Sequence, residues 1–324
     1  MHGVSTMAAA VLAGAVLIAP PASAQSAAGR VVHLVTGDPG GGTDFAARLM
    51  APGMAAQLGT QLIVENRGGA SGIIAAQTVA RAAPDGQTLL FYGNPVWLLQ
   101  YLRDDVPFDV EKDFAPVTIA VRSPNILVVH PSVQADSTRA LIELARSRPA
   151  TLNYAATGSG TPNHMAAELF KAMAGVDIVK ITYKGTGAAV SGLLRGDVHL
   201  MFGTIAAVAP QIKSGKLRAL AITSAQPSTL LPGVPTVSAS GLPGYQSGSA
   251  YGIFAPGATP AGIVDAVNRA AVAALRGNEV RDKLLATGVE PVGSTMREFI
   301  ELIKSERSRL GKVIRDAGIR DDAA

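Results

Sequence analysis

Glycine-rich turns that lead directly into helix starts are the stretches of this sequence best suited to chemistry. The first follows an apolar strand expected at residues 31–35, and after it Phe45, Ala46, Leu49 and Met50 recur at helical spacing, as on a buried helix face. Glycine lets a ligand approach the backbone, and the unpaired N–H groups of a helix start carry partial positive charge. We therefore expect the turn and helix start at residues 39–44 to hold a small anion.

A second turn of this kind lies in the other half of the chain. Residues 158–161 separate a strand expected at 152–156 from a helix expected at 162–174. Thr161 at the N-cap and Pro162 at the first helical position mark the start of that helix. His164 lies in its first turn, where a neutral imidazole could donate to the ligand or to a neighbouring loop. We expect this turn to face the first one across the ligand.

Other candidates have two open interpretations. Asn94 and Thr204 end strands at the same edges, so each could reach the ligand or cap a helix. Trp97 is the only tryptophan, and such residues more often lie in a core than against a ligand. Lys184 could pair with an anion, but a solvated side chain is the more common case, and the backbone of residues 185–187 is the better contact. His33, His130 and His199 lie in apolar runs and are expected to be structural.

Composition narrows the function. The chain has 324 residues, of which 48% are hydrophobic and 16% charged, so it is long enough for two globular domains. The net charge is +4, but Lys and Arg are scattered, which argues against a nucleic-acid partner. The absence of cysteine excludes disulfides and thiolate chemistry. The few histidines form no metal-binding pairs, and we expect neither a metal nor another cofactor.

Enzymatic motifs are missing as well. Residues 158–160 lack the outer glycines of a nucleophile elbow, and Phe45 occupies the place of the third glycine of a dinucleotide fingerprint. No phosphate-binding GKS or GKT motif occurs, and no base is paired with a nucleophile. We therefore expect a binding protein and not an enzyme.

The amino terminus predicts export. The first 24 residues contain no Asp, Glu, Lys or Arg, and the apolar run at 8–19 is too short to span a bilayer. Ala22, Ser23 and Ala24 then fit a signal-peptide cleavage site. The mature chain is expected to begin near Gln25.

Alternating strands and helices predict two α/β domains with mostly parallel sheets. A β-rich stretch at 113–130 is long enough to leave one domain for the other, and a strand at 248–255 leads back. We expect a signal peptide at 1–24, a first domain formed by 25–123 and 250–324, and a second domain formed by 124–249. Paired connections of this kind suit a hinge with a ligand cleft between the domains.

At this point the sequence resembles a known family, the Bug proteins, which are periplasmic solute-binding proteins of tripartite tricarboxylate transporters. The resemblance covers nearly the whole mature chain. Its motifs are PGGGTD at 39–44, VENR at 64–67, APDG at 83–86, DFAPV at 113–117, LNYA at 152–155, GSGT at 158–161 followed by His164, YKG at 183–185 and PVGS at 291–294.

The resemblance implies a type II periplasmic-binding-protein fold, in which two Rossmann-like α/β domains are joined by two crossing strands. It also implies a carboxylate bound in the interdomain cleft, often through water, and delivered to a two-component membrane permease. Residues 40–44 and 158–161 would be the two carboxylate loops, with Asp44 ordering its own helix start. We expect a periplasmic monomer. The alternatives are a sensor that docks on a membrane receptor and, less favoured, a hydrolase.

Two positions depart from the family pattern, because Gly37 stands where an aromatic residue is common and Gly203 where Asp is frequent. Both changes would leave room for a larger dicarboxylic or aromatic ligand, such as a terephthalate-type acid, with Trp97 or Tyr251 as a stacking surface. The residues expected to bind the ligand are Gly37, Gly40, Gly41, Gly42, Thr43, Asp44, Asn94, Gly158, Ser159, Gly160, Thr161, His164, Gly203, Thr204 and Tyr251.

Overall fold

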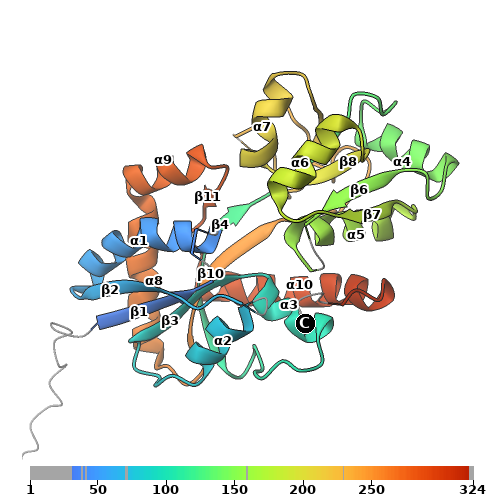
Figure 1. Ribbon diagram of the computed structural model, residues 1–324. Coiled ribbons are helices and arrows are strands. Elements are labelled where there is room, and N and C mark those ends of the chain that lie inside the picture. Colours follow the sequence, from blue (N-terminus) through green and yellow to red (C-terminus); the bar gives the residue numbers. More distant parts are fainter. Residues whose placement is uncertain are drawn as a thin grey trace, which may run out of the picture.

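Two β-sheets with helices packed against them make up the described part of the chain (Figure 1). The computed structural model describes residues 31–37, 39–40, 42–69, 72–157, 160–228 and 230–320. The predicted export segment lies outside these ranges, as do Gly41, Gly158 and Ser159 of the two glycine turns. None of the described helices combines the length and the apolar character that a membrane-spanning helix needs.

The first sheet has the strand order β11-β4-β10-β3-β1-β2. Its strands are β1 (Val31–Thr36), β2 (Gln61–Asn66), β3 (Thr88–Gly93), β4 (Phe114–Ser123), β10 (Ser249–Pro256) and β11 (Glu290–Pro291). β1 pairs in parallel with β2 and β3, as the strand-helix spacing predicts, whereas β10 is antiparallel to β3 and β4, and β11 is antiparallel to β4. The prediction of a mostly parallel sheet is wrong here because β4 leads the chain out of this sheet and β10 brings it back.

Helices cover both faces of the first sheet. On one face, α1 (Gly42–Leu58) and α8 (Ala261–Arg276) pack together, with α9 (Asn278–Ala286) beside them. On the other face lie α2 (Ile73–Ala80), α3 (Pro95–Leu102) and α10 (Met296–Asp316). In α1 the inward positions are Ala46, Ala47, Met50 and Met54, so Phe45, expected on the buried face, is 37% exposed.

The second sheet has the order β7-β6-β8-β5-β9. Its strands are β5 (Asn125–Val129), β6 (Asn153–Ala156), β7 (Val179–Thr182), β8 (Leu200–Thr204) and β9 (Arg218–Ile222), and its helices are α4 (Thr138–Ser147), α5 (Pro162–Ala174), α6 (Thr186–Arg195) and α7 (Ile205–Lys213). β6 is parallel to β7 and β8, whereas β5 is antiparallel to β8 and β9. This sheet is also mixed, because β5, the first strand after the crossing at Pro124, runs antiparallel to its neighbours β8 and β9.

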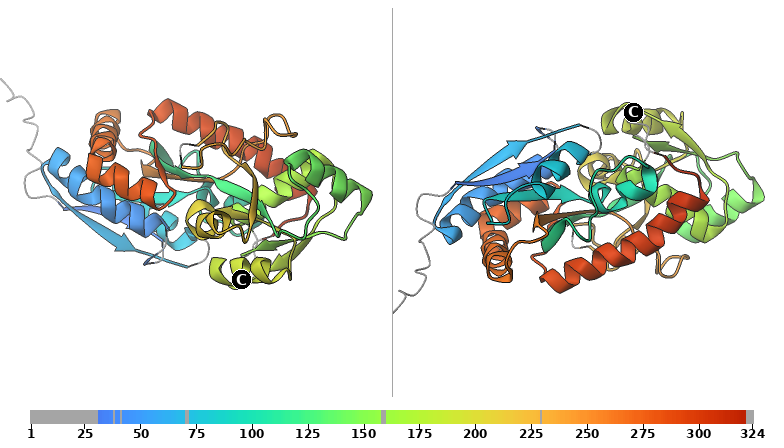
Figure 2. Two further views of the ribbon diagram at one scale, coloured as in Figure 1. Left: turned by 90° about the horizontal axis from the view of Figure 1, so that it is seen from above. Right: turned by 90° about the horizontal axis from the view of Figure 1, so that it is seen from below.

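The two sheets define two lobes, and the chain passes from one lobe to the other twice (Figure 1). Only Pro124 separates β4 from β5, and residues 223–248 connect β9 to β10. At the crossings Ser123 pairs with Ser249. Residues of both lobes also share one apolar core along α3, α5 and α10, and Figure 2 shows α10 running from the first lobe towards the second. The lobes are therefore held together on the α10 side, while the exact domain boundaries stay a prediction.

Candidate functional site

The turn between β1 and α1 is held in shape by the carboxylate of Asp44. Its Oδ2 accepts a hydrogen bond from the Gly40 amide at 2.9 Å, and its Oδ1 accepts from Arg48 Nε at 2.9 Å and from Asn66 Nδ2 at 2.8 Å. Burial of the carboxyl opposes ionisation, but these hydrogen bonds outweigh it and hold the pKa of Asp44 below its ordinary value. Asn66 also donates to the Gly37 carbonyl at 2.9 Å. Asp44 is thus engaged in ordering the turn.

Two tyrosines bracket this turn. A methyl group on Gly37 would lie 3.1 Å from Cε2 and 3.3 Å from the hydroxyl of Tyr92, and one on Gly72 would overlap the same ring. At the other end of the turn, a methyl group on Gly42 would lie 3.2 Å from the hydroxyl of Tyr251. Burial raises the pKa of Tyr251, so its phenol stays protonated and able to donate. The sequence analysis missed Tyr92, because nothing in the local sequence relates it to Gly37.

The space beside Gly37 is therefore not available to a ligand. The interpretation that glycine at this position leaves room for a larger molecule is wrong, since the Tyr92 ring from β3 occupies the place of the missing side chain. Tyr92 and Tyr251 lie on adjacent strands but pack against the opposite faces of the sheet. Gly37 thus lies beside Tyr92 and Thr43 Oγ1, and Gly42 beside Tyr251.

Asn94 and Trp97 are both engaged with the protein. The Asn94 side chain accepts from the Ala250 amide at 2.6 Å and donates to Glu306 Oε2 at 2.6 Å. Trp97 is fully buried, donates to Glu306 Oε2 at 2.8 Å, and packs edge-on against Phe299 at a centroid distance of 5.8 Å. The hypothesis that Trp97 stacks on a ligand is wrong. Asn94 caps no helix by its side chain but ties α3 to the crossing strand β10.

In the second lobe, the turn before α5 is ordered by His164. The Gly160 amide donates to His164 Nδ1 at 3.0 Å, and the imidazole is only 2% exposed. Thr161 is the N-cap residue as predicted, but its hydroxyl donates to Asn163 Oδ1 at 2.5 Å and does not cap the helix. Asn163 Oδ1 accepts the His164 amide instead, at 2.9 Å.

Gly203 and Thr204 end β8 beside the first crossing. A methyl group on Gly203 would lie 2.5 Å from Val208 Cγ1, so this glycine leaves no free space, and the interpretation that it widens the pocket is wrong. Thr204 is half-buried, pairs with Asn125 and precedes α7 without a capping hydrogen bond from its side chain. Asn125, which the sequence analysis missed, donates to the Pro162 carbonyl at 3.3 Å, and its buried Oδ1 has no partner among the described residues.

Both turns adjoin the junction of the lobes. Tyr251, which touches Gly42, lies in β10 two residues beyond Ser249, the start of that strand. Asn125, which contacts the start of α5, is the first residue after Pro124. A methyl group on Gly160 would lie 2.8 Å from Leu102 Cδ1, so the turn of the second lobe rests against the first lobe. Each turn thus has one contact near the junction of the lobes, Gly42 with Tyr251 and Gly160 with Leu102.

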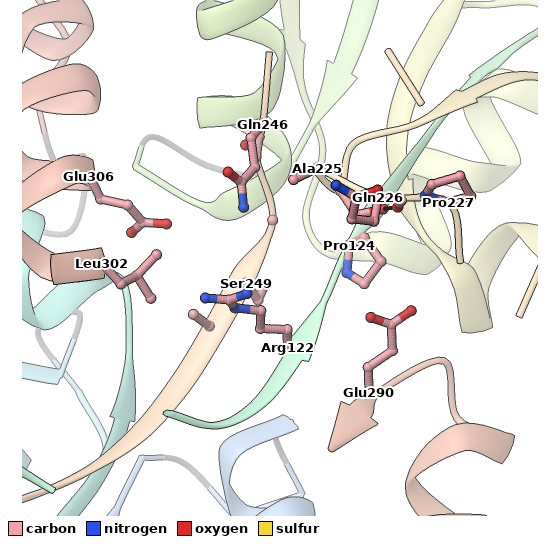
Figure 3. Close-up of a pocket in the computed structure, with 14 residues that line it drawn as sticks. Arg122, Pro124, Ala225, Gln226, Pro227, Gln246, Ser249, Glu290, Leu302 and Glu306 are labelled. Carbon is pink, nitrogen blue, oxygen red and sulfur yellow. Dashed lines mark hydrogen bonds between the residues drawn. The ribbon is translucent and has the colours of Figure 1, made fainter. Parts of the chain in front are cut away.

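A separate cavity of about 170 Å³ lies beside the crossing strands (Figure 3). Figure 3 shows Arg122, Gln246 and Glu306 pointing towards it. Arg122 pairs with Ala250, whereas Tyr251 is the next residue, so the Arg122 side chain lies on the face of the strands opposite Tyr251. Residues of both lobes line the cavity.

Comparisons with known proteins agree with this architecture. A family model described as "Tripartite tricarboxylate transporter family receptor" matches residues 46–319. The chain is 35% identical over 306 residues to Protein BugT of Bordetella pertussis, covering 94% of each chain. The structure titled "R. palustris Rpa4515 with adipate" has a TM-score of 0.74 and 35% identity, covering 90% of this chain and 98% of that one. The structure of MatC (Rpa3494) from Rhodopseudomonas palustris with bound malate has a TM-score of 0.71 and 32% identity, covering 88% and 99%.

Proposed function

Since the chain belongs to the tripartite tricarboxylate transporter receptor family, a family of solute-binding receptors, we propose that it captures a small dicarboxylate between its lobes and delivers it to a membrane permease. Two similar proteins were solved with adipate and with malate, which are both linear dicarboxylates. The observation that carries the proposal is the pair of glycine turns at helix starts, one in each lobe, that adjoin the lobe junction.

The proposed contacts are neutral donors. In the first lobe these are the amides of the 37–44 turn apart from that of Gly40, with the hydroxyls of Thr43 and Tyr251. In the second lobe they are the amides of the 158–161 turn apart from that of Gly160, because the Gly40, Gly160 and Thr161 donors already bond within the protein. Asp44 takes no part, because its oxygens already accept hydrogen bonds from its own turn and its neighbours. Hydrogen bonds to a charged group contribute about 1.5–3 kcal/mol each. About four of them reach the roughly 8 kcal/mol of micromolar binding after the cost of closure.

The ligand we favour is linear and has four to six carbons, as malate and adipate have. Tyr92 fills the space beside Gly37, which argues against the bulkier aromatic acid that the sequence analysis suggested. Tyr251 remains available as one wall, since it is half-buried. Gly203 offers no room either, because α7 packs against it through Val208.

Closure around the ligand would turn one lobe on the other at the two crossings. We propose that residues 25–123 with 250–324 move as one unit and residues 124–249 as the other. The shared core along α3, α5 and α10 would restrain this movement on that side. Removal of residues 1–24 near Ala24 would place the mature protein in the periplasm, where we expect a monomer.

A thermal-shift panel tests this function. The purified mature protein is heated with linear dicarboxylates of three to eight carbons, with citrate, with terephthalate and with acetate. A ligand at about 100 times its dissociation constant stabilises the fold by about 2.7 kcal/mol. We expect the largest rise in melting temperature for a dicarboxylate of four to six carbons. A panel in which no acid raises the melting temperature would overturn the proposal, and a maximum at terephthalate would restore the aromatic ligand.

A further inference from the structure

A buried polar chain leads from the second turn into the second lobe. The Gly160 amide donates to His164 Nδ1 at 3.0 Å. The other ring nitrogen, Nε2, lies 4.0 Å from Glu168 Oε1 on the next turn of α5. The same carboxylate oxygen accepts from the Tyr154 hydroxyl at 2.6 Å and from Lys171 Nζ at 2.9 Å. Gly160 is thus hydrogen-bonded to an imidazole whose other nitrogen faces the Glu168 carboxylate.

The Gly160 bond determines the protonation of the ring. A nitrogen that accepts a hydrogen bond carries no proton, so His164 is the neutral tautomer with its proton on Nε2, facing Glu168. A doubly protonated imidazole has no acceptor. Its Nδ1–H would point at the Gly160 N–H, and the hydrogen bond between the two groups would be lost.

The charges around His164 act in opposite directions. The ring borders a cavity of about 360 Å³ between α5, β7 and the residues that follow α10. The titratable groups that surround it are Glu168 and Lys171 of α5, Tyr154 of β6, Lys180 of β7 and Arg320 beyond α10. Glu168 favours an imidazolium, whereas the three cations oppose it. Burial, followed by the Glu168 charge, raises the pKa of Tyr154, so its hydroxyl remains a donor to Glu168.

We propose that His164 is a positioning residue that holds the Gly160 amide in place for carboxylate capture only while its ring is neutral, so that acidification weakens ligand capture. The inference rests on the proposed function, because it assigns a regulation to the same site. His164 makes no contact with the ligand in this arrangement. It acts through the Gly160 amide, just before the start of α5.

Two substitutions separate positioning from packing. His164→Asn keeps an acceptor where Nδ1 stands and does not titrate, whereas His164→Leu fills the space without an acceptor. His130→Asn is the matched control, because His130 bonds to Ser132 in a turn after β5 and touches neither glycine turn. Adipate affinity is measured by calorimetry at about pH 5.5 and 7.5, on either side of the usual histidine range. Each affinity is expressed for the adipate dianion, because part of the ligand is protonated at the lower pH.

We expect the affinity of the wild type to fall by about three- to tenfold from pH 7.5 to 5.5, which corresponds to the loss of one hydrogen bond. His130→Asn should show the same fall. His164→Asn should remove this difference, and His164→Leu should bind weakly at both pH values. A pH difference that persists in His164→Asn, or is absent from the wild type, would overturn the inference. Its failure is distinguishable from failure of the function, because the latter means that the wild type binds no carboxylate at either pH.

A readout without ligand completes the test. Amide hydrogen exchange of a peptide covering the 157–161 region, corrected for the intrinsic pH effect, should show less protection at pH 5.5 than at 7.5 in the wild type. In His164→Asn the protection should be the same at both values. Equal protection in the wild type would contradict the role of His164 even if His164→Leu failed to fold.

Discussion

Replacing Glu306 probes the contact network that joins α10 to the crossing strand. Glu306 is buried and accepts from the side chains of Asn94 and Trp97, and Asn94 in turn accepts from Ala250 of β10. Glu306→Leu leaves two buried donors without a partner, at about 1–3 kcal/mol each. Leucine also removes the cost of burying a carboxyl group, which offsets part of this loss. We therefore expect Glu306→Leu to lower the free energy of unfolding by about 3 kcal/mol.

Glu306→Gln should behave differently, because its amide oxygen can accept both hydrogen bonds. Burial raises the pKa of Glu306 above its ordinary value of 4.5, although Trp97, Asn94 and the nearby Arg309 and Arg122 favour the ionised form. A carboxyl with a raised pKa stabilises the fold fully below its unfolded pKa, and this stability is lost as the pH rises through the folded pKa. Glutamine does not titrate. Glu306→Gln should therefore gain stability relative to the wild type as the pH rises above 4.5.

Urea unfolding at a series of pH values measures these differences. Glu301→Gln on the exposed side of the same helix is the control and should change the free energy of unfolding by less than about 0.5 kcal/mol. The reasoning would be refuted if Glu306→Gln lost as much stability as Glu306→Leu at neutral pH. It would also be refuted if the Glu306→Gln difference became less favourable with rising pH.

Three further predictions concern Lys184, Gly203 and the pair of Gly72 and Tyr92. Lys184→Ala should change carboxylate affinity less than about twofold, because Lys184 is exposed and the proposed contacts are amides and hydroxyls; a tenfold loss in calorimetry would contradict this. Gly203→Asp should destabilise the fold by about 3 kcal/mol or more in urea unfolding, since its Cβ would meet Val208 and its charge would be buried; wild-type stability would show that space exists there. Gly72→Ala should lower the free energy of unfolding by about 1–3 kcal/mol, because φ is +94° and the new methyl group would overlap the Tyr92 ring. In the double variant, Tyr92→Ala should relieve part of this loss.

Local sequence signals predicted the framework well. Helix α5 has the predicted ends, Pro162 and Ala174, because proline fits the first helical position and Gly175 adopts the left-handed conformation that ends the helix. The glycine turns after β1 and β6 also follow from local signals. The resemblance to the Bug family and the α/β fold are confirmed by the family match and by the similar structures.

Elements without strong local signals were missed. Helix α3 was not predicted because its eight residues are apolar on nearly every side and follow a sequence typical of a turn, Gly93-Asn94-Pro95. Helix α4 has a readable pattern, with Ser137 as a capping residue and Leu141, Ile142 and Ala145 buried, and was overlooked. The directions of β4, β5 and β10 depend on how the chain crosses between lobes, which spacing alone does not fix.

The site was predictable only as far as the backbone determines it. Whether a glycine opens space depends on side chains from other segments, and Tyr92 and Val208 fill the positions beside Gly37 and Gly203. The same holds for Trp97, whose partner Glu306 lies 209 residues away in the sequence. Burial of this kind follows from tertiary packing and has no local pattern.

The position of the bound acid tests the central claim most directly. A crystal structure of the mature protein with the dicarboxylate that gives the largest thermal shift should place a carboxylate about 3 Å from backbone amides of the 37–44 and 158–161 turns, directly or through one water. A carboxylate bound elsewhere, for example at Arg122 in the cavity behind the crossing strands, with both turns unoccupied, would contradict the account.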